Sequence, residues 1–194
     1  MQEIALVLLG SALVNNLLLT QTLGVSALIG MSAPGISFRP GIALAFAAAT
    51  GLVLVTGTGV NHLLYHGLLL PLGLAYLALP VFVLMIATIA QLLLAGSRRL
   101  DYHHQIDARR NLLIANAAVL GVTLNEVAAT PSLTLALLRA LGAALGFALV
   151  LVLLAGLRGQ LTESAIPVPF RGSSIVLITA GLMALAFMGF TGMG

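Results

Sequence analysis

The sequence alternates long apolar runs with short polar breaks. Most of the runs are close to the roughly 20 apolar residues that an α-helix needs to cross the hydrocarbon core of a bilayer. The breaks hold turn-forming residues, such as Pro34 with Gly35. The pattern therefore predicts an all-α integral membrane protein with six transmembrane helices. The six runs cover residues 4–24, 41–60, 68–95, 111–125, 133–157 and 173–192.

Composition supports this interpretation. Hydrophobic residues make up 60% of the 194 residues and charged residues 7%, and the mean hydropathy is +1.16. Because six crossings with short loops use the whole length, we expect one membrane domain over residues 1–194 and no soluble catalytic domain. The absence of cysteine excludes disulfides, thiolate zinc sites and cysteine nucleophiles from this chain.

The positive charges are distributed unevenly among the breaks. With six crossings, the first, third and fifth loops share one side, and they hold seven of the eight basic residues, all of which are arginine. Short arginine-rich loops stay in the cytoplasm. We therefore predict a multi-pass protein of the bacterial inner membrane with both termini on the periplasmic or external side, and no nucleic-acid partner. The seven residues are Arg39, Arg98, Arg99, Arg109, Arg110, Arg158 and Arg171.

Six crossings divide into two sets of three, and an odd number of crossings reverses the direction of the chain. Two similar halves, about 1–96 and 105–194, would therefore form inverted three-helix repeats. The segment 26–30 is similar to 117–121, which is a weak signal because apolar segments match one another by chance. The residues are thus compatible with an inverted repeat and with unrelated halves.

All five carboxylates fall outside the apolar runs, and Glu126 is expected in the fourth loop. This placement disfavours a carrier that binds its ion through its own intramembrane carboxylate. Neutral polar residues remain within the runs, among them Gln91. Four of them are candidates for a polar seam where the two halves meet, and the alternative is hydrogen bonding between packed helices. These four are Asn15, Asn16, Gln21 and Asn116.

Two further patterns have a structural and a functional interpretation. His62 and His66 are spaced i, i+4 but lack a clear third ligand, so we expect them at the membrane interface rather than in a metal site. Gly142 and Gly146 have the small-xxx-small spacing that permits close helix contact, within this chain or against a partner.

Four stretches carry a resemblance to a known family: residues 167–189, Leu13-Val14-Asn15-Asn16, Leu23-Gly24 and Ala118-Val119-Leu120-Gly121-Val122. They resemble the A-type (RnfA-like) membrane component of the Rnf-type electron-transport complexes, which have homologous subunits in Nqr complexes. The resemblance implies inverted three-helix halves with external termini. It also implies a homologous six-helix membrane partner (RnfE-like) and other Rnf-type subunits, in a complex that couples electron transfer to sodium or proton translocation.

The resemblance further implies a membrane 2Fe-2S cluster, to which each of the two homologous subunits contributes two cysteines. In this chain the corresponding positions are Ser26 and Ala117, beside Asn116, so both thiols are missing and no cofactor is expected from this chain alone. Natural divergence or deliberate replacement would explain the loss, and drift of neighbouring residues favours divergence.

The leading functional hypothesis is a non-catalytic subunit of a redox-driven ion translocase. The alternatives are a stand-alone inverted-repeat transporter of ions or small solutes, with the polar seam as its binding site, and a purely structural assembly subunit.

Overall fold

The computed structural model describes residues 2–14, 16–20, 24–31, 40–96, 114, 116–129, 132–161 and 166–189. Every regular element in these ranges is helical. The α-helices are α1 (Gln2–Leu9), α2 (Leu17–Thr20), α3 (Val25–Met31), α4 (Pro40–Leu64), α5 (Ala78–Gly96), α8 (Ala117–Ala129), α9 (Leu133–Gln160) and α10 (Ser173–Met188). Shorter π and 3₁₀ segments are η1 (Gly10–Val14), η2 (Tyr65–Leu69), η3 (Ala75–Leu77) and η6 (Val168–Phe170).

Three helical stretches in the described ranges are long and apolar enough to cross a membrane: Pro40–Leu69, Ala75–Gly96 and Leu133–Gln160. Helices α8 and α10 are apolar but shorter, and their 13 and 16 residues rise about 20 and 24 Å. The hydrocarbon core is about 30 Å thick. The structure thus contains an all-helical membrane protein with three full-length spanning candidates and shorter apolar helices beside them.

The first apolar run is broken into short pieces rather than forming one helix over 4–24. Helix α1 passes into the π-helical η1, and α2 and α3 follow as separate segments. Asn16 begins α2, where its carbonyl oxygen accepts hydrogen bonds from the backbone N–H groups of Leu19 and Thr20. Gly24 precedes α3 with a φ of 95°, a conformation that favours glycine. Hydropathy averages over both breaks, which explains why the apolar pattern alone misses them.

The predicted break between Asn61 and Gly67 is also wrong. Helix α4 continues to Leu64 and then as η2 to Leu69, with Asn61 and His62 on its buried face. The chain turns later, around Pro71 and Gly73, which has a φ of 69°. The third helical stretch therefore starts at Ala75 instead of residue 68, because the leucines before it belong to the end of the preceding helix.

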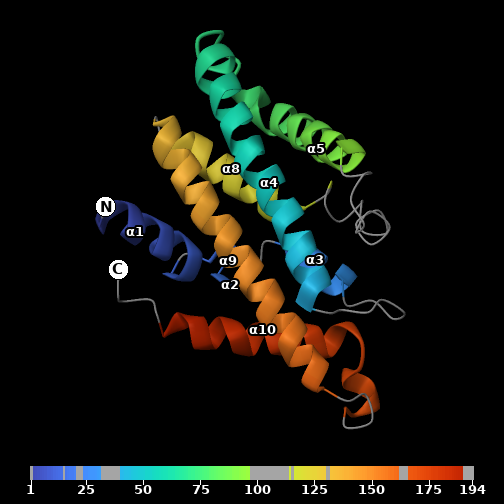
Figure 1. Cartoon of the computed structure of the whole chain (residues 1–194). Helices are drawn as coiled ribbons and strands as arrows, with labels where there is room; N and C mark the ends of the chain where they lie inside the picture. The colour runs from blue at the N-terminus through green and yellow to red at the C-terminus, as the bar shows by residue number, and fades with distance from the viewer. Residues whose placement is uncertain are drawn as a thin grey trace.

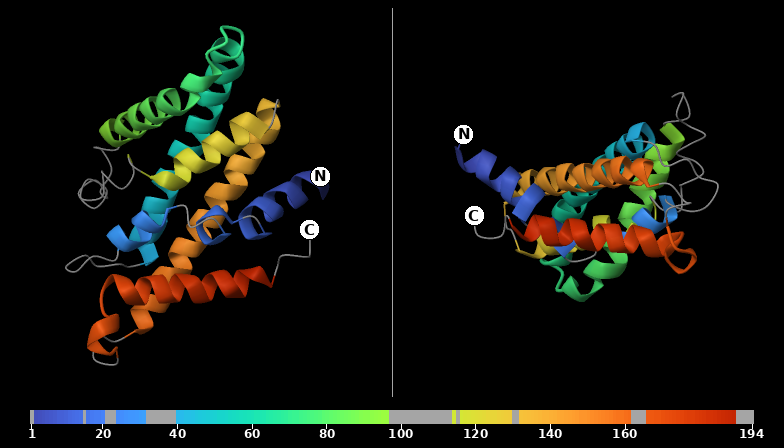
Figure 2. Two further views of the ribbon diagram at one scale, coloured as in Figure 1. Left: turned by 180° about the vertical axis from the view of Figure 1, so that it is seen from behind. Right: turned by 90° about the horizontal axis from the view of Figure 1, so that it is seen from below.

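Helices α4 and α9 form the centre of the molecule and make its most extensive interhelical contact (Figure 1). Helix α5 packs on α4 and α8, while α10 packs on α9 and on the short helices α2 and α3. Helix α1 and η1 lie along α9. The left view of Figure 2 shows α5 and α10 on opposite ends of the α4–α9 pair.

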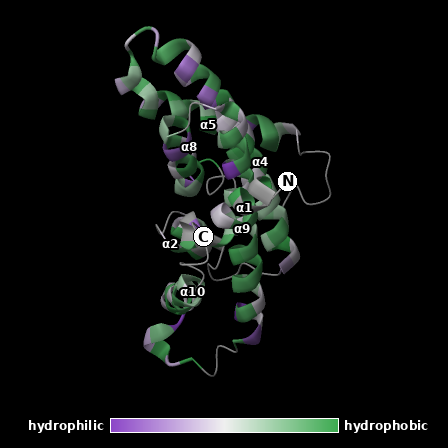
Figure 3. Ribbon diagram, turned by 90° about the vertical axis from the view of Figure 1, so that its left-hand side faces the viewer, coloured by the Kyte–Doolittle hydropathy of each residue, from purple (hydrophilic) through white to green (hydrophobic). Residues whose placement is uncertain are grey.

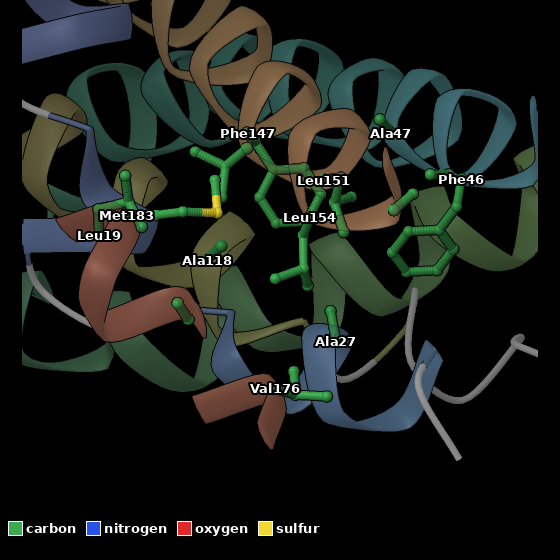
Figure 4. Close-up of a cluster of buried hydrophobic side chains, with 14 of the residues drawn as sticks. Leu19, Ala27, Phe46, Ala47, Ala118, Phe147, Leu151, Leu154, Val176 and Met183 are labelled. Atoms are coloured by element: carbon green, nitrogen blue, oxygen red, sulfur yellow. The ribbon is translucent and has the colours of Figure 1, made fainter. Parts of the chain in front are cut away.

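The buried core forms two clusters along the central pair. One cluster, drawn in Figure 4, joins side chains of α9 such as Phe147 and Leu151 to Leu19, Ala118 and Met183 from three other helices. The other lies between α4, α5, α8 and α9 around Val53 and Val119. Outside them, long apolar side chains are widely exposed, and the hydrophobic colouring extends over the outer helical faces (Figure 3). An apolar outer surface of this kind suits contact with lipid.

Candidate functional site

Two short helices in different halves of the chain start at an asparagine. Asn16 precedes α2, and Asn116 precedes α8. The carbonyl oxygen of Asn116 accepts the backbone N–H of Val119 at 3.1 Å, and its Oδ1 accepts the N–H of Ala118 at 3.0 Å. Asparagine is a favoured residue for this N-terminal capping role. Both asparagines therefore supply backbone partners where a helix is interrupted.

Gly24 brings the start of α3 against the start of α8. A Cβ added at Gly24 would lie 3.1 Å from Cβ of Ala118, 3.2 Å from Cε2 of Phe147 and 3.6 Å from Oδ1 of Asn116. The backbone at Gly24 therefore approaches α8 and α9 more closely than a larger residue would allow. We call this meeting point of Gly24, Asn116, Ala118 and Phe147 the helix-start junction.

Ser26 and Ala117 are exposed residues at the starts of α3 and α8, close in sequence to this junction. Each is exposed, whereas the next residue in the sequence, Ala27 or Ala118, is buried in the same core cluster. Figure 4 shows these two alanines facing the interior of the cluster. The two positions to which the resemblance assigns cluster ligands are thus both on the surface, one in each half of the chain.

The side chains present at these positions do not fit an iron–sulfur cluster. Ser26 offers a hydroxyl oxygen and Ala117 offers no donor atom, whereas 2Fe-2S centres are held by thiolates or imidazoles. The chain contains no cysteine. Among the residues that the structure describes, no three His, Cys, Asp or Glu side chains gather as a metal site. This chain therefore lacks the chemistry of the cluster that its sequence pattern implies.

The structure describes only part of the predicted polar seam. Asn15 and Gln21 lie outside the described residues, while Asn16 and Asn116 are both buried. The amide nitrogen of Asn16 donates to the carbonyl oxygen of Ala12 at 2.9 Å and to that of Gly146 at 3.1 Å. Nδ2 of Asn116 is buried without a hydrogen-bond partner. Asn16 bonds to Gly146, and Asn116 belongs to the junction together with the next residue of α9, Phe147. Both side chains therefore lie near the same turn of α9.

The glycine spacing on α9 proves to be a close contact within the chain. A Cβ added at Gly142 would lie 2.6 Å from Cβ of Ser11, and one added at Gly146 would lie 2.5 Å from the carbonyl oxygen of Ala12. These two glycines let η1 pack directly on the α9 backbone. The prediction of close helix packing at this spacing is confirmed.

A second set of polar residues lies where α4, α8 and α9 pack together. Three of them, Asn61, His62 and Glu126, fall in the predicted breaks but lie within helices. Glu126 is not in a loop but within α8, 8% exposed, with Oε2 at 3.5 Å from Nη1 of Arg139 on α9. His62 is buried within the protein, and its ring centroid lies 4.4 Å from that of His66. Both side-chain polar atoms of Asn61 are buried without a hydrogen-bond partner. We call Asn61, His62 and Glu126, together with their partly exposed neighbours His66 and Arg139, the buried polar cluster.

One signal in the sequence points to this cluster. Thr58, Asn61, His62 and Tyr65 recur at the spacing of one helical face, as residues of an amphipathic helix do. Read as helix rather than as a break, the spacing predicts a polar stripe on a buried face. Thr58 in fact contacts Thr123 of α8, with 3.4 Å between the two hydroxyl oxygens.

Comparison with known proteins gives a full-length match. The chain fits the family model described as "Rnf-Nqr subunit, membrane protein" over residues 4–194. It is 38% identical to the A component of the ion-translocating oxidoreductase complex of Alkalilimnicola ehrlichii, over 100% of this chain and 98% of that protein. The proteins of the same name from Pseudoalteromonas translucida and Aeromonas hydrophila are 38% and 37% identical over the same shares.

Proposed function

This chain belongs to the Rnf-Nqr family of membrane subunits, and from that premise we propose that it is the A component of an ion-translocating oxidoreductase complex and forms part of the membrane core. The 38% identity to proteins of that name, over the full length of this chain, supports the assignment. In this role the chain is a multi-pass scaffold, and the redox cofactors lie on other subunits.

We further propose that the chain forms two inverted three-helix halves. The packing of the helices supports this arrangement, because each contact of a first-half helix with the second half has a counterpart made by the corresponding second-half helix. Helix α5 of the first half packs on α8 of the second, and α10 of the second half packs on α2 and α3 of the first. Helix α4 packs on α8, as α9 packs on α1 and η1. In the proposed arrangement, a pseudo-two-fold axis between α4 and α9 would relate the two sets.

The arginine distribution supports an orientation with both termini outside the cytoplasm. The absence of native cysteine permits a direct test with single introduced cysteines and a membrane-impermeant maleimide. L72C, in the exposed turn before α5, is expected to react in intact cells. S173C, at the exposed start of α10, is expected to react only after the membrane is opened. The reverse labelling pattern would contradict the orientation.

We propose that a homologous six-helix subunit docks over the exposed side of the helix-start junction. The observation that carries this proposal is that Ser26 and Ala117, from different halves, are both exposed around the same buried contact. Because their side chains lack sulfur, this docking is structural in the present chain, and no electron passes through a cluster that the chain helps to bind.

The test restores the missing thiols. We expect the purified wild-type complex to lack the visible absorbance of a 2Fe-2S cluster bound by this chain, and the S26C/A117C double variant to gain it. S26C and A117C alone serve as matched controls and should not gain it. A cluster in the wild-type complex that depends on this chain would overturn the proposal. Failure of the double variant to gain iron would show that the two positions do not form a half-site.

One observation favours a second function, that of a stand-alone transporter. The buried Nδ2 of Asn116 has no partner, as expected for a group that binds a solute. The two functions differ in assembly. Co-purification with flavin-bearing subunits and with a homologous membrane protein supports the redox complex, whereas a homodimer that moves solute in liposomes would favour the transporter.

A further inference from the structure

A cavity of about 120 Å³ lies between the end of α9 and the start of α10. The end of α9, η6 and the start of α10 meet at one end of the molecule (Figure 2). One buried water needs about 10 to 15 Å³ of cavity volume on the same measure, so the cavity has room for a group of several non-hydrogen atoms. Its described lining consists of Arg158, Leu161, Ile166, Arg171, Gly172 and Ile175.

Two guanidinium groups give this cavity its charge. Nη1 of Arg158 is buried and has no hydrogen-bond partner. Nε of Arg171 donates to the carbonyl oxygen of Ile166 at 2.9 Å, which fixes the direction of that side chain. No acidic residue is among the described lining residues. A buried donor of a charged group without an acceptor is costly, so the arrangement calls for an anion.

The surroundings of the cavity are apolar and exposed. Val168 and Phe170 in η6, which directly precedes Arg171, are 73% and 49% exposed. On the other side, a hollow of about 10 Å³ shares Arg158, Leu161 and Ile175 with the cavity and continues to Leu154 and Val176. Charge in the cavity and apolar surface on both sides match a molecule with an anionic group and hydrocarbon chains.

We propose that this cavity binds the phosphodiester headgroup of an anionic membrane lipid. Arg158 and Arg171 bind the phosphate oxygens, and the exposed Val168 and Phe170 lie among the lipid chains. Arginine suits this role because its planar fork donates two parallel hydrogen bonds to phosphate. Basic pockets between transmembrane helices commonly bind anionic lipid headgroups. The inference rests on the cavity alone and does not depend on the redox assignment.

The test compares lipids on the full-length chain by native mass spectrometry of detergent-purified protein. Equimolar phosphatidylglycerol and phosphatidylcholine are offered, and the retained lipid is counted. Wild-type protein is expected to retain phosphatidylglycerol preferentially. R158Q and R171Q are each expected to lower that preference about fivefold, the effect of one arginine near a membrane surface.

R139Q is the matched control. It removes one positive charge from the other end of α9, where Arg139 contacts Glu126 and does not line the cavity. Its lipid preference should equal that of the wild type. If R139Q and R158Q lost the preference for phosphatidylglycerol equally, the preference would depend on net charge alone, and the proposed site would be wrong. Because R158Q removes a partly buried side chain, R171Q keeps the test valid if R158Q does not fold.

A further experiment distinguishes the two sources of the anion, a lipid headgroup and free phosphate. Millimolar inorganic phosphate should not displace phosphatidylglycerol, and displacement would assign the cavity to a free phosphate instead of a lipid. Glu163 is the carboxylate in the sequence between Arg158 and Arg171. E163Q is expected to leave the preference for phosphatidylglycerol in place. Equal retention of the two lipids by wild-type protein would overturn the proposal.

Discussion

The helix-start junction and the buried polar cluster use buried polarity in opposite ways. At and beside the junction, Oδ1 of Asn116 accepts the N–H of Ala118 at the start of α8, and the amide of Asn16 donates to the carbonyl oxygens of Ala12 and Gly146, so both side chains bond to backbone where a helix is interrupted. In the polar cluster, Asn61 and Glu126 lie inside regular helices whose backbone needs no such help. The comparison teaches that a buried polar residue of this fold bonds to the backbone where a helix is interrupted, whereas inside a regular helix it needs a side-chain partner, as Glu126 has in Arg139.

The largest effect is expected where η1 and Asn16 pack on α9. In G146V the new side chain would meet the carbonyl oxygen of Ala12 and the amide of Asn16, and we expect a loss of about 3 kcal/mol in the free energy of unfolding. Denaturant titration in mild detergent measures the change. G156V on the same helix is the control, because Gly156 is exposed with no atom near an added Cβ. Equal losses would contradict close packing at Gly146.

N116L removes the capping oxygen of α8. Loss of an N-terminal cap costs about 1 to 2 kcal/mol, so we expect a destabilisation of that size together with impaired assembly or function of the complex. N125L, at an exposed position of the same helix, should have little effect. Unchanged stability and assembly of N116L would show that Asn116 only fills space.

The Glu126–Arg139 pair is expected to contribute less than the cap. The Arg139 side chain is 38% exposed and that of Glu126 10% exposed, so E126Q should destabilise by about 1 kcal/mol and R139Q by less. The E126Q/R139Q double variant completes a thermodynamic cycle with the same denaturant titration. A coupling free energy of zero would mean that the two side chains do not interact in the membrane protein.

The smallest effect is expected at Asn61, and its sign is reversed. Because both polar atoms of its side chain are buried without a partner, N61L should be neutral or stabilising by up to about 1 kcal/mol. N61L and N116L are the same substitution on two buried asparagines, so their difference measures the contrast directly. A destabilised N61L would indicate that Asn61 has a partner of its own, such as a bound water or ion.

Hydropathy was sufficient to locate the long helices. Residues 133–157 and 173–192 correspond to α9 and α10, because both are continuous helices between turn-forming residues. Hydropathy failed where polar residues lie inside a continuous helix and where a helix breaks within an apolar run. Asn61 and His62 are buried within α4, and the first run breaks at Asn16 and Gly24, where capping and a positive φ decide the conformation.

The candidate site was predicted in part. The polar pattern singled out Asn16 and Asn116, which are both buried, whereas Asn15 and Gln21 lie outside the described residues. The assignment of Ser26 and Ala117 as related ligand positions stays a prediction. The cavity between α9 and α10 was not predicted. It depends on a contact between Arg171 and Ile166 in a connecting segment, which no periodicity reveals.

The bond between Asn16 and Gly146 also has a consequence for biogenesis. Its two residues are 130 positions apart in the sequence, so the ribosome completes most of the chain before the acceptor for this amide exists. None of the fragments α1, α2 and α3 is long enough to cross the bilayer as a single helix. The first segment therefore reaches its final position late, when the newly made α9 supplies the surface that holds it.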